Sequence, residues 1–120
     1  MATFLSAEWI DELDAAAAAI TVEALPALCI EHLVDDFVYH VAYEDSRVRF
    51  RVGEAQQPTV RITTDRVTAA SIARGELSAQ RAFMNGFLRV DGDTLRLANA
   101  QPSLRLLPDF FADVRETTEW

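Results

Sequence analysis

The segment that decides the fold is Leu28–Val52, which reads LCIEHLVDDFVYHVAYEDSRVRFRV. Apolar and polar side chains alternate along three runs, which Asp35-Asp36 and Glu44-Asp45-Ser46 separate. Alternation with a period of two indicates half-buried β-strands, and short polar breaks of this kind indicate turns. The sequence therefore predicts three consecutive antiparallel strands, at residues 28–34, 37–43 and 47–52.

The two turns also predict which residues of neighbouring strands face each other. The predicted pairs are Ile30 with Val41, His32 with Tyr39, Glu31 with His40, Tyr43 with Val48, Val41 with Phe50, and Tyr39 with Val52. One face of the sheet then collects apolar and aromatic side chains. The other face collects Glu31, His40, Arg49, Arg51 and Arg61. A shift by one residue would mix these two sets, so we predict one apolar and one solvated face, with Glu31 and His40 as a solvated pair.

Helices and two further strands are predicted around this segment. The expected N-caps are Ser6, Asp65, Ser78 and Asp93. The expected helices are Ala7 to about Ile20, Arg66–Arg74, a short one ending at Asn85, one that includes Leu95 and Leu97, and a last one with Pro108 in its first turn. The expected strands are Thr59–Thr64, as the fourth strand of an antiparallel meander, and Phe87–Asp91. We predict an α/β (α+β) fold over residues 1–120 as one domain, with a five-stranded, mainly antiparallel sheet covered on one face by helices.

Charge and composition exclude several classes of protein. The chain has 11 basic residues, all arginine, against 19 acidic residues, which gives a formal net charge of −8. Such a charge repels polyphosphate, so we expect no nucleic-acid partner and at most transient contact with a membrane. Cys29 is the single cysteine, no basic leader opens the sequence, and the uncharged run Ala15–Val22 is far shorter than a membrane span. These features predict a cytoplasmic protein.

The sequence contains no recognisable catalytic or metal-binding motif. Asp35-Asp36 beside His32 is explained by turn chemistry, and Cys29 alternates away from the apolar face with no neighbouring base. The arginines of the solvated face could receive an acidic partner or a coenzyme A phosphate, although pairing with nearby acids is the favoured interpretation. We therefore predict no metal, no cofactor and no catalytic residue, while an enzymatic role stays open.

The segment Ala73–Asp93 reads ARGELSAQRAFMNGFLRVDGD. It combines a helix ending in Gly75-Glu76-Leu77-Ser78 with Ala82-Phe83, a second glycine, an alternating strand and Gly92-Asp93. Together with the opening Phe4–Trp9, it resembles the sterol carrier protein type 2 family, and its small stand-alone bacterial members in particular, over nearly the whole chain. The resemblance implies an apolar cavity between the sheet and the helices that holds fatty acyl chains, sterols or similar molecules.

The candidate ligand-binding residues come from the apolar face of the sheet and from the helices. They are Ile30, His32, Tyr39, Val41, Phe50, Ile62, Phe83, Leu95, Phe110 and Phe111. Periodicity alone favours a filled core, and only the resemblance reverses this in favour of a cavity. His32 either contacts a ligand or is a buried histidine satisfied by Tyr39 or by the backbone.

The leading hypothesis is a monomer or homodimer that binds, and in a further step transports, a lipid or other apolar small molecule such as a fatty acyl or sterol-like ligand. One alternative is a small pathway enzyme or accessory protein that uses the same pocket, with His32 or Tyr39 as the acid or base. Another is a protein-interaction module with a collapsed cavity, which docks through Phe110–Trp120.

Overall fold

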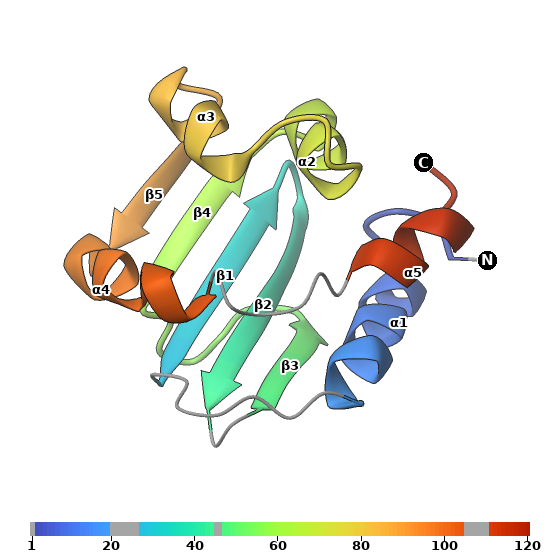
Figure 1. The fold of residues 1–120 in the computed structure, drawn as a ribbon, viewed down its shortest axis with the longest axis horizontal. Helices are drawn as coiled ribbons and strands as arrows, with labels where there is room; N and C mark the ends of the chain where they lie inside the picture. Colours follow the sequence, from blue (N-terminus) through green and yellow to red (C-terminus); the bar gives the residue numbers. More distant parts are fainter. Residues whose placement is uncertain (1, 20–26, 45–46, 105–110) are drawn as a thin grey trace.

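A computed structural model describes residues 2–19, 27–44, 47–104 and 111–120, without the side chains of residues 101, 103, 104, 111 and 113. The strands are β1 (Leu28–Val34), β2 (Phe37–Glu44), β3 (Arg47–Val52), β4 (Val60–Thr64) and β5 (Leu88–Gly92). The helices are α1 (Ala7–Ala18), α2 (Arg66–Ala73), α3 (Ala79–Met84), α4 (Thr94–Leu104) and α5 (Phe111–Thr117) (Figure 1). The predicted ends near Ile20 and Pro108 and the turn at Asp45-Ser46 lie outside the described residues.

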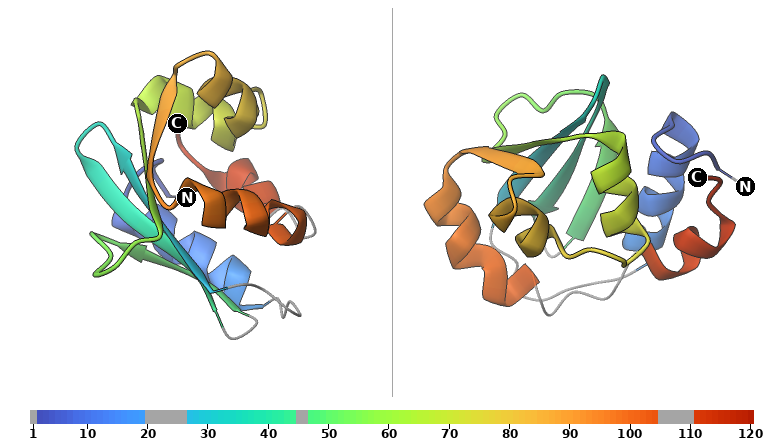
Figure 2. Two further views of the ribbon diagram at one scale, coloured as in Figure 1. Left: turned by 90° about the vertical axis from the view of Figure 1, so that its left-hand side faces the viewer. Right: turned by 90° about the horizontal axis from the view of Figure 1, so that it is seen from above.

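The strands form one sheet in the order β3-β2-β1-β4-β5, and the predicted register of its first three strands is confirmed. Val41 faces Ile30 on one side and Phe50 on the other, and His32 faces Tyr39. All the described helices gather on one side of the sheet (Figure 2, left), around the margins of that face (Figure 1). The predicted α/β class, with a mainly antiparallel five-stranded sheet covered on one face, is therefore confirmed.

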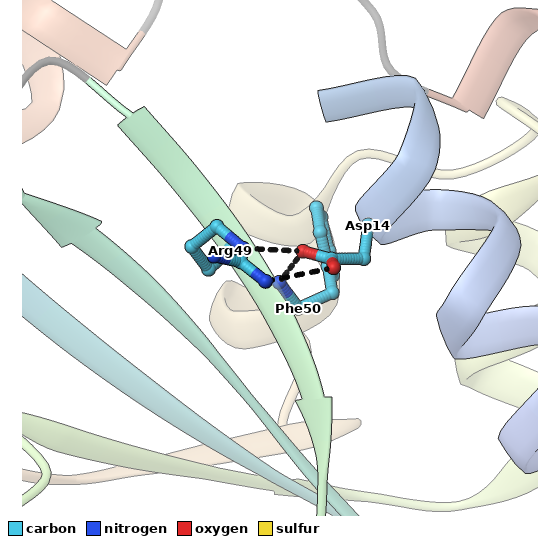
Figure 3. Close-up of polar contacts among 3 residues, drawn as sticks. All are labelled: Asp14, Arg49 and Phe50. Atoms are coloured by element: carbon cyan, nitrogen blue, oxygen red, sulfur yellow. Dashed lines mark hydrogen bonds and ion pairs between the residues drawn. The ribbon is translucent and has the colours of Figure 1, made fainter. Parts of the chain in front are cut away.

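The predicted meander is wrong for the fourth strand. β4 does not pair with β3 but lies parallel to β1, with Val60 opposite Ile30 and Thr64 opposite Val34, and β5 then pairs antiparallel with β4. The outer edge of β3 is occupied by α1 instead, as Figure 3 shows around Asp14.

Asp14 attaches α1 to that edge through three hydrogen bonds. Its carboxylate accepts from Arg49 Nε at 3.0 Å, from Arg49 Nη2 at 3.2 Å and from the backbone amide of Phe50 at 3.0 Å (Figure 3). Burial raises the pKa of Asp14, but the hydrogen bonds from Arg49 and Phe50 outweigh burial and hold this pKa below its usual range. Covering an edge strand in this way satisfies a backbone donor that would otherwise be open to another strand.

Side-chain caps start the helices as predicted. Ser6, Asp65, Ser78 and Asp93 each accept a hydrogen bond from the backbone amide three residues later, at 3.2, 2.7, 3.1 and 3.0 Å. Such caps satisfy amides that have no partner within the helix. They fix the residue at which α1, α2, α3 and α4 each begin, and thus which side chains of these helices face the sheet.

The predicted solvated pair of Glu31 and His40 is also wrong. The two residues face each other in the sheet, but Glu31 is only 1% exposed and is paired with Arg61, while Nδ1 of His40 lies 3.0 Å from the carbonyl of Gly53. Because β4 lies beyond β1, the connection from β3 must cross this face of the sheet, and the amide of Ala55 within it donates to Glu31 at 2.9 Å. The crossing segment therefore covers Glu31.

Two glycines with positive φ allow a matched test of how β5 packs against Thr59. At Gly92 (φ +113°) an added Cβ would lie 2.6 Å from the carbonyl oxygen of Thr59, whereas at Gly53 (φ +100°) it would meet nothing within 4 Å. We expect Gly53→Ala to cost about 1 kcal/mol through backbone strain alone, and Gly92→Ala to cost about 2 kcal/mol because of the added clash. Urea unfolding measures both, and equal losses would contradict the packing of β5 against Thr59.

Candidate functional site

A cavity of about 250 Å³ lies between the apolar face of the sheet and the helices, and it is partly open to the outside. Alternate residues of β1 and β2 form its sheet wall, together with Phe50 of β3 and Ile62 of β4. Trp9 of α1 and three residues of α2, including Ala69 and Ile72, form its helical walls. The cavity is therefore bounded by elements from both halves of the chain.

Six of the ten predicted ligand-binding residues line this cavity: Ile30, His32, Tyr39, Val41, Phe50 and Ile62. Phe83 is 54% exposed and Leu95 is 70% exposed, and the structure does not bring either to the cavity. α3 buries Ala82 and α4 buries Ala100, so the helix faces that carry Phe83 and Leu95 turn outward. Phe110 and the side chain of Phe111 lie outside the part of the chain that is described.

Other lining residues were not predicted. Tyr43 follows the same alternation along β2 as Tyr39 and Val41, so the register alone could have identified it. Ala69 and Ile72 share one face of α2, but their spacing does not say whether that face meets the sheet. Trp9 lies on the buried face of α1, and the sequence of that helix does not indicate that this face meets the cavity.

Aromatic rings give one end of the cavity a fixed structure. The rings of His32 and Tyr39 are stacked, with centroids 4.7 Å apart and planes at 8°. Trp9 meets Tyr39 edge-on at 6.1 Å, and Phe4 meets Trp9 edge-on at 4.9 Å. These contacts hold the ring of Tyr39 between strand and helix, because edge-to-face and stacked pairs are both favoured geometries.

The polar groups of the cavity wall are uncharged at neutral pH. Burial lowers the pKa of His32 to about 4, raises the pKa of Tyr43 to about 12 and raises the pKa of Tyr39 further. His32 and Tyr43 are half-buried and both line the cavity. Among the described lining residues none carries a charge.

Reactive groups elsewhere do not assemble a second site in the described parts of the chain. Residues 2–19, 27–44, 47–104 and 111–120 hold no cluster of three or more histidine, cysteine or acidic side chains that could bind a metal. Burial, together with Glu31 and Glu44, raises the pKa of the Cys29 thiol, which disfavours the nucleophilic thiolate. Of the arginines predicted to pair with nearby acids, Arg49 pairs with Asp14 and Arg61 pairs with Glu31.

The fold and the cavity together define an α/β protein whose helices and curved sheet enclose an apolar space. The chain belongs to the SCP-2 sterol transfer family, whose family model matches residues 8–104. This membership supports binding or transfer of a sterol or other lipid in general terms. No curated protein sequence matches the chain. No helix within the described residues is long and apolar enough to cross a membrane.

Solved structures share the fold at low sequence identity. Sterol carrier protein-2 like-3 from Aedes aegypti is 13% identical, with 82% of this chain and 94% of that one covered at a TM-score of 0.58. Palmitated SCP2L2 from the same species is 18% identical, with 84% and 93% covered at a TM-score of 0.55. The sec-alkylsulfatase Pisa1 from Pseudomonas sp. is 17% identical over 85% of this chain at a TM-score of 0.50. This chain spans only 13% of the length of that enzyme.

Proposed function

We propose that the 120-residue chain acts as one domain that binds a lipid or other apolar small molecule, of the fatty acyl or sterol-like kind, in this cavity and passes it on. The observation that carries the proposal is the cavity itself, which is walled by apolar and aromatic side chains in a family of sterol-transfer proteins. We expect a cytoplasmic protein that is monomeric or homodimeric, and its acidic charge supports only transient contact with anionic membranes.

The energetics of the cavity favour a bound molecule. Groups that line an apolar hollow lack the packing contacts that a filled core would give them. A ligand that restores those contacts recovers much of their energy, and ordered water recovers little where polar partners are few. The empty cavity therefore lowers the stability of the folded protein, and a bound apolar ligand raises it again.

The size of the cavity limits how much of a ligand it encloses. The cavity of about 250 Å³ is partly open, so a ligand that is longer than the cavity can extend beyond it. A longer acyl chain or a sterol has to extend through the open side. Catalysis in the same space is less well supported, because the pKa values of His32 and Tyr39 are shifted away from neutrality, where an acid or base works best.

A variant that fills the cavity tests the proposal. Ala69 of α2 lines the cavity, whereas Val67 on the same helix is 78% exposed and does not. We expect Ala69→Phe to weaken binding of the uncharged fluorophore N-phenyl-1-naphthylamine at least about tenfold, since the new ring occupies the space of the ligand. Val67→Phe, the matched control, is expected to bind like the wild type.

The comparison uses proteins that unfold cooperatively, as checked by circular dichroism. Absence of saturable binding to the wild type would overturn the proposal. So would equal affinity of the Ala69→Phe and Val67→Phe proteins, because the fluorophore would then bind elsewhere.

A further inference from the structure

We propose that the bound molecule is an uncharged lipid with a single hydrogen-bonding group, of the alcohol, ketone or ester type, and that His32 and Tyr39 receive this group. The inference rests on the proposed function and narrows its ligand class. It sets this chain apart from a carrier of ionised fatty acids, which needs a cation in or beside its cavity.

Two polar side chains of the described residues face the cavity without a hydrogen-bond partner. His32 and Tyr39 are cross-strand neighbours on β1 and β2, stacked at 4.7 Å, and both line the cavity. Tyr39 is 8% exposed, and within the described residues neither its hydroxyl nor a ring nitrogen of His32 makes a hydrogen bond. Buried polar groups are rarely left unpaired, so this pair is suited to accept a partner from a ligand.

The side chains of His32 and Tyr39 cannot easily turn toward other hydrogen-bond partners. Trp9 packs edge-on against Tyr39, and Phe37 lies against the same ring at 6.1 Å. The stack with His32 fixes the remaining side. The hydroxyl and the imidazole are therefore held in place before a ligand arrives, which lowers the entropic cost of binding.

The charge of the cavity lining disfavours an ionised ligand at this pair. No described lining residue is charged. Arg66 Nη2 lies 3.4 Å from the carbonyl of Phe4, and Arg115 Nε donates to that of Ala73 at 2.7 Å, so both guanidinium groups contact the backbone around the cavity. An ionised carboxylate placed against His32 and Tyr39 would lose its hydration without an ion-pair partner among the described lining residues, which is strongly unfavourable. A hydroxyl or a carbonyl carries no such penalty.

The chemistry of the pair also ranks uncharged ligands. Neutral imidazole offers one N–H donor and one acceptor nitrogen, and a phenol both donates and accepts. An alcohol uses both capacities, a ketone or ester only accepts, and a haloalkane forms no comparable hydrogen bond. Preference for the alcohol is thus a signature of the pair that apolar contact alone would not produce.

The experiment displaces N-phenyl-1-naphthylamine from the wild-type protein at pH 8 with 1-decanol, 1-chlorodecane and decanoate. We expect 1-decanol to displace the fluorophore at concentrations about tenfold lower than either of the others. His32→Phe, which keeps an aromatic ring but removes both nitrogens, is expected to bring 1-decanol and 1-chlorodecane within about twofold of each other. His40→Phe, on the opposite face of the sheet, is expected to keep the wild-type ratio.

The outcomes separate the two proposals. If the fluorophore binds but decanoate competes as well as 1-decanol, the inference is overturned and the proposed function stands. If the fluorophore and all three compounds fail to bind, the proposed function itself fails. A wild-type ratio retained in a folded His32→Phe protein would overturn the role of the pair, and Tyr39→Phe, which removes only the hydroxyl, repeats that test independently.

Discussion

Replacing Arg61 with methionine is expected to lower the free energy of unfolding by about 3 kcal/mol, because the substitution leaves a buried carboxylate without its charged partner. The Glu31 side chain is 1% exposed, whereas that of Arg61 is 45% exposed, so the loss of hydration falls almost entirely on Glu31. Among the described residues, the amide of Ala55 would be its one remaining hydrogen-bond donor. A single neutral donor does not replace a guanidinium beside a buried anion.

The matched control is the exposed pair of Arg89 and Asp91, at 3.0 Å. Arg89→Met is expected to change stability by no more than about 0.5 kcal/mol, because both partners are solvated. Adding Glu31→Gln to Arg61→Met is expected to recover part of the loss, since the unpaired charge is then gone. Urea unfolding at pH 7 measures all three, and an Arg61→Met loss as small as that of Arg89→Met would show that water reaches Glu31.

Acidification from pH 6.5 to pH 4 is expected to cost up to about 3 kcal/mol of stability through His32 alone. Burial lowers the pKa of the folded-state imidazole from 6.5 to about 4. In this window the unfolded chain binds a proton that the folded chain does not, so stability falls as pH falls, by at most about 1.4 kcal/mol per pH unit. Asp14 and Asp65, whose pKa values are lowered, add their losses mainly below this window.

The control removes the imidazole. Urea unfolding at pH 7, 6 and 5 is expected to show a clearly shallower decline for His32→Phe than for the wild type. Parallel declines for His32→Phe and the wild type would mean that His32 is protonated in the folded protein with little cost, and that its surroundings are wetter than the structure shows.

The parts of the fold that follow from the sequence are those set by neighbouring residues. Asp35-Asp36 joins β1 to β2 directly, so turn chemistry and alternation were enough to place Ile30 opposite Val41 and His32 opposite Tyr39. The position of β4 depends on a longer connection and on which sheet edge remains open. α1 occupies the outer edge of β3 through the contacts of Asp14 with Arg49 and Phe50, so β4 pairs at the free edge of β1. These contacts join residues that are 35 or more positions apart, and no local sequence pattern predicts them.

The same distinction applies to the candidate site. The sheet wall could be predicted, because alternation assigns each residue of a strand to one face, as with Tyr39 and Val41. The helical wall could not, because α3 has only six residues and its buried residue is Ala82, so Phe83 faces outward. The burial of Glu31 was missed for a related reason, since it depends on a connection that crosses the sheet only when β4 lies beyond β1.

The central claim is that the cavity between the sheet and α2 holds an apolar molecule, and a crystal structure of gently purified protein tests it most directly. We expect elongated density for an acyl or sterol-like molecule along Val41 and Phe50, with its polar end at His32 and Tyr39. A cavity filled by repacked protein side chains, in crystals grown with and without added 1-decanol, would contradict it.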